Sequence, residues 1–393
     1  MNIAVIAPTH IPARRANTLQ VMKMAQALTS LGHNVRLATP GPKPDFEEDS
    51  RPEILWERLA RHYGLRHKFP IDWLSSNPRL RGYDFSLRAV RWARSWKARL
   101  IYTRLPQVAA ISSQLGTETI FEIHDLPQGK MAPILLRSFI RGKGARRLVV
   151  ITQALAADLA QELGAPLITP VTIVAPDGVD LERYANLPSP AQARGQLAVE
   201  GRIPNGKELS SGQFIAGYSG HLYPGRGTTL LLEMAARLPE ITFLIVGGEP
   251  PDVFDLQERA KNQGLGNVIL TGFVPNADLP RYQAACDVLL MPYQQRVAAS
   301  SGGDIARYLS PMKLFEYMAC ERAIISSDLP VLQEVLNQEN AIFLPGEDVE
   351  AWAKALEDLR ASPETRQKLA RQARQDANLY TWENRAARIL EGI

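Results

Sequence analysis

The chain has 393 residues, of which 45% are hydrophobic and 22% are charged. This length exceeds a typical single core and predicts two globular domains of about 150–200 residues each, with no large disordered region. Its two cysteines, Cys286 and Cys320, exclude a disulfide framework and a cysteine metal cluster and favour a reducing, cytoplasmic location. The opening segment 1–8 reads as a strand rather than a signal peptide, and no apolar run approaches the roughly 18 residues of a membrane span, so we expect a soluble protein.

The net charge of +4 conceals a difference between the two halves of the chain. Residues 1–185 contain 25 Lys and Arg against 16 Asp and Glu, a net +9, whereas residues 186–393 contain 20 against 25, a net −5. Basic residues concentrate in 79–104 and 137–147, which suits anionic lipid headgroups, phosphates or nucleic acid, although solvated helix faces explain them equally well. We favour peripheral contact with the inner face of a membrane. Nucleic acid is disfavoured, because stacking platforms other than Trp92 and Trp96 are lacking.

The first 185 residues alternate apolar strands with helices and predict the first domain. A strand at 2–7, a helix at 17–31 and a strand at 34–39 form an opening βαβ unit, and 41–98 has no clear pattern. The alternation then continues with strands at 100–103, 119–123 and 148–151, helices at 107–115, after Pro133 and at 153–163, and a last strand and turn at 171–180.

Residues 186–212 are rich in Pro, Gly, Ser and charge and predict a linker. Residues 213–375 predict the second domain, and residues 376–393 a C-terminal helix. In the second domain, strands are expected at 214–218, 242–246, 267–270, 287–291, 323–326 and 341–343, and helices at 228–238, 253–264, 278–285, 311–320 and 330–336. This alternation predicts an α/β protein with two doubly wound parallel sheets.

The segment 310–319 carries the strongest functional signal. Ser310 is expected to cap a buried helix and Pro311 to be its first residue. A helix start leaves about four N–H groups unpaired and has a partial positive charge, so it suits a phosphate, and Lys313 adds a full charge. Glu316 follows one turn later and could bind a pair of ribose hydroxyls. The alternative is an ordinary amphipathic helix with solvated Lys and Glu.

The glycine-rich turn 217–227 is a second candidate for phosphate binding. Gly220 would let the backbone approach a phosphate, and both His221 and Arg226 could point at it. The GxGxxG fingerprint is absent, and no acidic residue ends the second strand of either sheet, which argues against NAD. A turn that needs glycine for backbone reasons alone is the alternative.

Three further groups follow strands, where open α/β sheets bind their ligands. The strand that ends near residue 123 brings Glu122 and His124 to its end, and His124 could bond a substrate hydroxyl, stabilise developing charge or be purely structural. The segment 271–275 could pair with a base edge or form a plain turn. The loop 292–309 is long and rich in Gly and Ser, which is typical of a lid.

The sequence has no nucleophile elbow, HExxH, CxxC or Walker A pattern. Phosphate and sugar-hydroxyl binding without a metal site suits a nucleotide-sugar enzyme whose own cations neutralise the leaving diphosphate. The motifs together resemble the retaining, metal-independent glycosyltransferases of family four. The matching blocks are 2–7, 15–22, 121–125, 175–180, 217–227, 243–248, 271–275, 310–319 and 323–335.

This resemblance implies the GT-B fold, in which two Rossmann-like domains face a central cleft and the C-terminal helix crosses back to the first domain. It implies transfer of a hexose from a nucleotide-diphosphate sugar to a hydroxyl acceptor (a glycan, a lipid-linked acceptor or a small molecule) without a cofactor or metal. The implied donor contacts are Glu316 to the ribose, Gly220, His221, Arg226, Pro311, Met312, Lys313 and Leu314 to the diphosphate, and Phe273 and Val274 to the base. His124 would contact the transferred sugar as the catalytic residue. Asn17 would face the cleft from the first domain, and Arg104 is a further candidate for contact with the donor or the acceptor.

Two departures from the family pattern affect the expected site. Tyr308 occupies the position of a glutamate that contacts the donor sugar in the family, and Asp304 is a possible substitute. His221 replaces an arginine, so we expect diphosphate binding to weaken above neutral pH. Because of these two changes, a non-catalytic protein that binds a nucleotide sugar is an alternative function. A nucleotide-sugar epimerase is a weaker alternative, because it would need acid and base carboxylates beyond Glu122 and Asp125.

Overall fold

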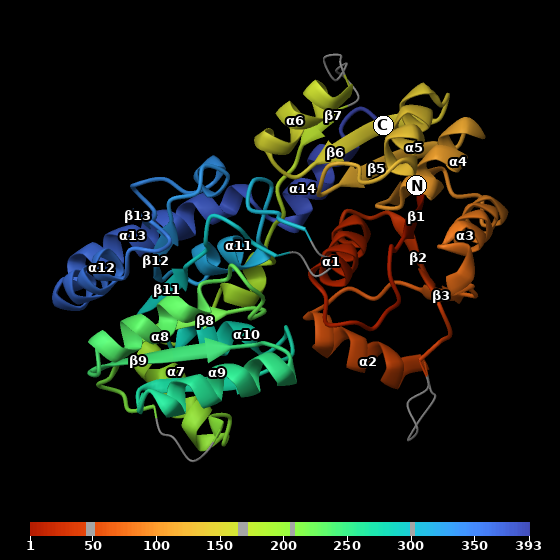
Figure 1. Cartoon of the computed structure of the whole chain (residues 1–393). Coiled ribbons are helices and arrows are strands. Elements are labelled where there is room, and N and C mark those ends of the chain that lie inside the picture. The colour runs from red at the N-terminus through yellow and green to blue at the C-terminus, as the bar shows by residue number, and fades with distance from the viewer. Residues whose placement is uncertain (45–51, 164–171, 205–208, 299–302) are drawn as a thin grey trace. The chain divides into compact units, whose positions relative to one another are not determined.

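The computed structural model describes residues 1–44, 52–163, 172–204, 209–298 and 303–393. The chain divides into two compact units, the first formed by Met1–Asp177 together with Trp382–Ile393 and the second by Gly178–Thr381. Each unit contains one parallel sheet flanked by helices (Figure 1). The prediction of two doubly wound, Rossmann-like parts is confirmed.

The sheet of the first unit has the strand order β3-β2-β1-β4-β5-β6-β7. The strands are β1 (Asn2–Ile6), β2 (Asn34–Pro40), β3 (Ile71–Leu74), β4 (Leu100–Thr103), β5 (Glu118–Ile123), β6 (Ala145–Val150) and β7 (Thr172–Val174). Val5 at the centre pairs with Leu37 on one side and Tyr102 on the other. The winding reverses between β1 and β4, so the loops after these two strands diverge where ligands bind in such sheets.

Helices cover both faces of this sheet. They are α1 (Ala16–Ser30), α2 (Pro52–Tyr63), α3 (Tyr83–Ser95), α4 (Pro106–Gln114), α5 (Met131–Arg141), α6 (Gln153–Leu163) and α14 (Trp382–Leu390). Phe85 and Val90 of α3 and Val108 of α4 pack against Ile6 and Ile101 of the sheet. α1 is buried along most of its length, because it contacts β2, α2 and the C-terminal helix α14.

The second unit has a six-stranded parallel sheet in the order β10-β9-β8-β11-β12-β13. The strands are β8 (Phe214–Ser219), β9 (Ile241–Val246), β10 (Val268–Gly272), β11 (Val288–Met291), β12 (Ala323–Ser327) and β13 (Ile342–Leu344). The five strands other than β13 contain long runs of buried residues, as expected for a sheet covered on both faces. The winding reverses here between β8 and β11.

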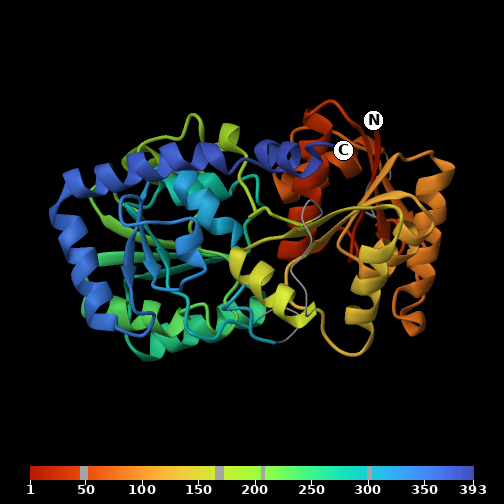
Figure 2. The same cartoon turned by 90° about the horizontal axis from the view of Figure 1, so that it is seen from above.

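The helices of this unit form two layers. They are α7 (Pro190–Val199), α8 (Thr228–Arg237), α9 (Pro250–Asn262), α10 (Leu279–Ala284), α11 (Met312–Ala319), α12 (Val349–Ala361) and α13 (Pro363–Asp376). α8, α9 and α12 contribute to one core cluster, and α7, α10 and α11 to the other. Figure 2 shows the green helices α8 and α9 on one side of the sheet and the blue α13 on the other. The helix expected at 330–336 is only a short 3-10 turn, η4 (Leu332–Glu334).

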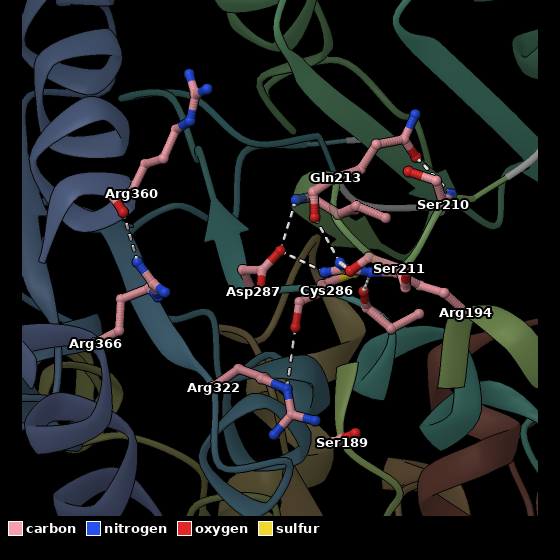
Figure 3. Close-up of polar contacts among 12 residues, drawn as sticks. Ser189, Arg194, Ser210, Ser211, Gln213, Cys286, Asp287, Arg322, Arg360 and Arg366 are labelled. Carbon is pink, nitrogen blue, oxygen red and sulfur yellow. Dashed lines mark hydrogen bonds and ion pairs between the residues drawn. The ribbon is translucent and has the colours of Figure 1, made fainter. Parts of the chain in front are cut away.

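The region 186–212, which its composition predicts as a linker, contains α7 and packs within the second unit. α7 begins with a capping box, in which Ser189 and Gln192 exchange hydrogen bonds. Its Arg194 is only 2% exposed and forms an ion pair with Asp287, while its Nε donates to the Ala285 carbonyl at 2.8 Å (Figure 3). Composition does not reveal these contacts, because they join α7 to residues about 90 positions further along the chain.

We predict that Arg194→Met lowers the free energy of unfolding by about 3–5 kcal/mol, because it leaves Asp287 without its buried cation. Arg360→Met is the matched control, since Arg360 is 45% exposed and its partner Glu240 is 41% exposed. That surface pair should contribute less than about 1 kcal/mol. Urea denaturation followed by circular dichroism measures both values. Equal losses in the two variants would contradict a structural role for the Arg194 pair.

Candidate functional site

Two loops meet where the winding of the second sheet reverses. One is the glycine-rich turn between β8 and α8, and the other begins at Pro292 after β11 and leads to α11. The N–H of Gln294 donates to the Gly225 carbonyl at 3.0 Å, so the two loops are hydrogen-bonded to each other. A Cβ at Gly227, where φ is +77°, would lie 2.0 Å from the Pro292 carbonyl oxygen. Glycine is therefore required here by both the backbone conformation and the close approach.

α11 begins one residue later than the sequence predicts. Pro311 occupies the N-cap position in an extended conformation, and the helix runs from Met312. Ser310 therefore precedes the cap, which corrects its predicted role. The N-cap residue Pro311 has no side-chain group that could bond to the N–H groups of the first turn, so it does not compete with an anion for them. The turn that contains Pro311, Met312, Lys313 and Leu314 lies beside the glycine loop, since Lys313 approaches Gly220.

Lys313 is the most unusual side chain of this region. Its buried Nζ has no hydrogen-bond partner among the described residues, and it lies 3.7 Å from the centroid of the Tyr218 ring and 5.4 Å from that of Tyr293. Burial, followed by the charge of Arg226, holds the pKa of Lys313 well below its usual value, and Glu316 opposes this shift. The ammonium group therefore occupies a place that would be stabilised by a bound anion.

Gly220 and Arg226 are further residues of this region, next to the Lys313 ammonium. A Cβ at Gly220 would lie 2.9 Å from Lys313 Nζ, so glycine leaves the space in front of the ammonium free. Arg226 donates from Nη1 to the Tyr293 hydroxyl at 3.1 Å, and its buried Nε has no partner among the described residues. His221 stacks on Tyr223 with ring centroids 4.7 Å apart. The predicted diphosphate residues therefore lie on adjacent loops of one unit.

Glu316 lies one turn beyond Lys313 and is only 7% exposed. Its carboxylate accepts two long hydrogen bonds, from Asn276 Nδ2 at 3.4 Å and from Gln283 Nε2 at 3.3 Å. These weak contacts leave the carboxylate able to accept hydrogen bonds from ligand hydroxyls.

Tyr218, Tyr293 and Asn276 were not predicted as site residues, although they lie at the ends of strands like those that were. Tyr218 lies near the end of β8 and Tyr293 just after β11, and together their rings form the surroundings of Lys313. Phe273 and Val274 follow β10 and are half-buried, and Val274 packs on the core of the unit. Asn276 follows directly and reaches the carboxylate of Glu316.

In the first unit, the end of β5 carries a buried carboxylate–imidazole pair. Glu122 is fully buried and accepts a hydrogen bond from His124 Nε2 at 2.5 Å. Gln20 Nε2 donates to the same carboxylate at 2.7 Å, the Tyr102 hydroxyl donates to its other oxygen, and Arg385 forms an ion pair with it at 2.9 Å. Arg385 could not be predicted from the sequence, because it belongs to α14 and is 263 residues from its partner.

Arg104 lies close enough to act on the same pair, and Asn17 belongs to α1, the helix that also carries Gln20. Arg104 Nη1 donates to Gln20 Oε1 at 3.3 Å, and Asn17 Oδ1, in the first turn of α1, is buried without a partner among the described residues. Burial and the nearby Arg104 guanidinium lower the pKa of His124 to about 4, so the imidazole is neutral at pH 7. Burial also raises the pKa of Asp177 to about 7.

A metal ion fits this cluster poorly. Ligand atoms of Glu122, His124 and Asp177 lie within 4.8 Å of one another. The charges of Arg104 and Arg385 act on the same group, and Arg385 already pairs with Glu122. A divalent cation would therefore compete with fixed cations for these carboxylates.

Residues 200–376 match the family model described as "Glycosyl transferases group 1", and residues 19–183 match "Glycosyltransferase Family 4". The chain is also 31% identical to the 2-deoxystreptamine glucosyltransferase of Streptomyces kanamyceticus, over 70% of this chain and 74% of that one. It belongs to the group 1 glycosyltransferases. The D-inositol 3-phosphate glycosyltransferase of Jonesia denitrificans is 24% identical over 91% of this chain and 80% of its own length.

Solved structures show that this glycosyltransferase has the GT-B fold. The HepE protein of Anabaena in complex with UDP and glucose has a TM-score of 0.73 and 18% identity, with full coverage of both chains. The sucrose-phosphate synthase of Thermosynechococcus elongatus has a TM-score of 0.72 and 19% identity over 99% of this chain and 97% of that one. At this identity the similarity concerns the fold alone.

In this glycosyltransferase, Asp304 and Tyr308 lie in the segment before α11, of which residues 299–302 are outside the described part. Asp304 is exposed and accepts the N–H groups of Val297 and Ala306, both at 2.9 Å, so its carboxylate shapes the loop. These two bonds hold the pKa of Asp304 below its usual value. Tyr308 is buried, with 8% of its surface exposed.

The surroundings of His221 revise its expected pH dependence. Burial lowers the pKa of this imidazole from its usual 6.5, so the glycosyltransferase holds it neutral at pH 7. His221 therefore carries a positive charge only at pH values below about 6.5, and it has already lost this charge at neutral pH.

We predict that the donor KM changes little between pH 7 and 8 and falls as the pH drops below about 6.5, because protonated His221 adds a cation to a diphosphate site. A gain of about tenfold is expected from one charge-assisted hydrogen bond. Steady-state kinetics with a nucleotide sugar, whose diphosphate ester does not titrate in this range, measures it. His221→Gln is the control and should abolish the dependence; the same acid response in that variant would exclude His221 as its source.

Proposed function

We propose that this glycosyltransferase transfers a hexose, with retention of the anomeric configuration, from a nucleotide-diphosphate sugar to a hydroxyl acceptor and without a metal ion. The observation that carries the proposal is the buried ammonium of Lys313 at the start of α11, which has no hydrogen-bond partner among the described residues and faces Gly220. A diphosphate would supply the missing anion. Arg226 and Glu316 both lie near enough to influence the pKa of Lys313, so diphosphate and ribose contacts would come from one place.

The same groups support metal independence. The charge that develops on a leaving nucleoside diphosphate needs cations close to its oxygens. Lys313, Arg226 and the start of α11 would supply this charge from the protein. Phe273 and Val274 are the residues we propose for the base, and Glu316 is the one for the ribose hydroxyls.

The first unit supports retention through a front-face substitution. In this reaction the bond between the anomeric carbon and the phosphate oxygen breaks, and the acceptor hydroxyl attacks from the same face. The acceptor proton passes to the departing phosphate oxygen. Glu122, the carboxylate next to His124, is bound by four donor groups and is therefore a poor nucleophile, which disfavours a covalent glycosyl intermediate. We assign contact with the transferred sugar to His124, and we propose Arg104 and Asn17 as further donor or acceptor contacts.

The test is a panel of UDP-, GDP- and ADP-sugars assayed for release of nucleoside diphosphate with and without EDTA. We expect turnover of at least one donor, unchanged by EDTA, and an anomeric configuration in the product that equals that of the donor by NMR. Lys313→Met should raise the donor KM by at least about 100-fold, because it removes a charge–diphosphate interaction from a buried site. Lys354→Met is the matched control, since Lys354 is 74% exposed on α12.

The alternatives give different results in the same assay. Saturable donor binding without turnover would support a non-catalytic binding protein, and interconversion of the donor sugar would support an epimerase. Loss of activity with EDTA, restored by a divalent metal, would contradict the metal-independent mechanism. A Lys313→Met variant with unchanged donor KM would contradict the proposed diphosphate site.

We also propose that the first unit binds the cytoplasmic face of an anionic membrane, where it would meet a lipid-linked acceptor. Of the eleven large apolar side chains that are exposed in the described parts of the chain, five lie on one layer of helices: Tyr83, Leu87, Met131, Ile134 and Ile140. Two more, Leu80 and Leu115, lie just before and just after helices of this layer. The layer is α3, α4 and α5, in which α4 contacts both of its neighbours. No described helix is long and apolar enough to cross a bilayer, so the contact would be peripheral.

Charge supports a lipid surface as the partner of this layer. The segment 129–145 has four basic side chains, all exposed, and no acidic one: Lys130, Arg137, Arg141 and Lys143. Apolar side chains among exposed Lys and Arg are the pattern of a surface that inserts shallowly between anionic headgroups.

We predict that the protein co-sediments with phosphatidylglycerol vesicles and not with phosphatidylcholine vesicles. Arg137→Ser/Arg141→Ser should weaken partitioning by about 30-fold, since each basic residue contributes about 1 kcal/mol near an anionic surface. Met131→Ser/Ile134→Ser should weaken it as well, whereas Phe254→Ser, a control at a 66% exposed position of α9, should not. Activity on a soluble acceptor should stay unchanged in all these variants. Equal binding to neutral vesicles, or no effect of either double variant, would contradict this surface.

A further inference from the structure

The carboxylate of Glu122 is the most heavily bonded charged group of the first unit. It points from β5 towards the face covered by α1 and α14, and its side chain is fully buried. Its Oε1 receives three donors, from Gln20, His124 and Arg385, and its Oε2 receives the Tyr102 hydroxyl. A buried carboxylate with this many donors is ionised, because each bond stabilises its charged form. Burial alone would raise the pKa of Glu122. The opposite effects of Arg385 and then His124 outweigh it, so the pKa lies well below its usual value.

Arg385 supplies the compensating charge from the C-terminal helix. Its side chain is 3% exposed, and besides Glu122 it binds two backbone carbonyls, with Nε donating to Pro176 at 2.8 Å and Nη2 to Ala175 at 3.1 Å. The guanidinium is therefore fixed by several hydrogen bonds in a planar geometry that lysine cannot reproduce. It holds Glu122 in place and keeps it charged.

An ionised carboxylate can only accept hydrogen bonds. His124 must therefore carry its proton on Nε2, which lies 2.5 Å from Glu122 Oε1. In the neutral imidazole, Nδ1 is then left as an acceptor. We infer that Glu122 and Arg385 are positioning residues that fix the tautomer and orientation of His124, so that its Nδ1 accepts a hydrogen bond from a substrate hydroxyl.

This inference rests on the proposed function in one respect, the contact between His124 and the transferred sugar. The tautomer itself does not depend on that contact, so the two ideas can fail separately. The inference also gives the C-terminal helix a part in positioning His124, because Arg385 holds the carboxylate of Glu122 that orients the imidazole.

The experiment records long-range ¹H–¹⁵N NMR spectra of protein labelled with ¹⁵N-histidine at pH 7, in which a His124→Gln spectrum identifies the signals of residue 124. We expect the wild-type imidazole to be the Nε2–H tautomer. In Glu122→Gln, whose amide no longer requires an Nε2–H donor, we expect averaged tautomer signals. The kcat should fall by about 10–100-fold, since a misplaced catalytic group costs on this order, and the donor KM should change less than about threefold.

Two further variants separate positioning from stability. Tyr102→Phe removes the donor to Oε2 and leaves the bond to His124 intact, so it should keep the wild-type tautomer and a kcat within about threefold. Glu122→Asp keeps the charge that Arg385 needs but withdraws the oxygen from His124, so it should lower kcat while folding normally by circular dichroism. Arg385→Lys should lower kcat less than Arg385→Gln does.

Three results would overturn the inference. They are an Nδ1–H tautomer in the wild type, an unchanged His124 spectrum and kcat in folded Glu122→Gln or Glu122→Asp, and a loss in Tyr102→Phe as large as in Glu122→Gln. Full activity in His124→Ala would instead remove the sugar contact from the proposed function and leave the tautomer result intact. If no donor is turned over, the spectra alone decide between the tautomers.

Discussion

The buried ammonium of Lys313 is the constraint on which the second unit depends. Removing a charge from water is costly unless an opposite charge or hydrogen-bond acceptors replace the water. Here the rings of Tyr218 and Tyr293 face the ammonium, and Arg226 nearby disfavours its charged form further. The loops that hold it are fixed by glycine contacts and by the strands before them, so the group cannot simply move into solvent. An anion bound beside it would stabilise it.

The first unit solves the problem of buried charge in the opposite way. Glu122 is surrounded by donors and paired with Arg385, so it has little capacity left for a ligand. The two arrangements suit two tasks. A network in which every polar group has a hydrogen-bond partner holds a side chain such as His124 in one orientation. A charged group without such a partner can instead bind a ligand of opposite charge. One glycosyltransferase thus carries a rigid network in one unit and a receptive cation in the other.

Much of the architecture could be predicted because it follows from local pattern. Strands such as β1, β9 and β12 are apolar runs between turn residues, and α11 was expected within one residue of its actual start. The helix α7 and its Arg194 escaped prediction, because their stabilising contacts come from residues remote in the chain. β3 escaped as well, since its four residues have no apolar alternation and are ordered by pairing with β2.

By itself, the sequence determined the order of strands and helices, the glycine turn after β8, and the spacing that places Lys313 and Glu316 one turn apart on a single helix. These are properties of neighbouring residues, and neighbouring residues fix local conformation. Only the tertiary structure decided that Lys313 has no hydrogen-bond partner in the described part of the chain, that Asn276 and Gln283 reach Glu316, and that Arg385 neutralises Glu122. Burial and charge pairing depend on which distant segments pack together, and no local pattern encodes that.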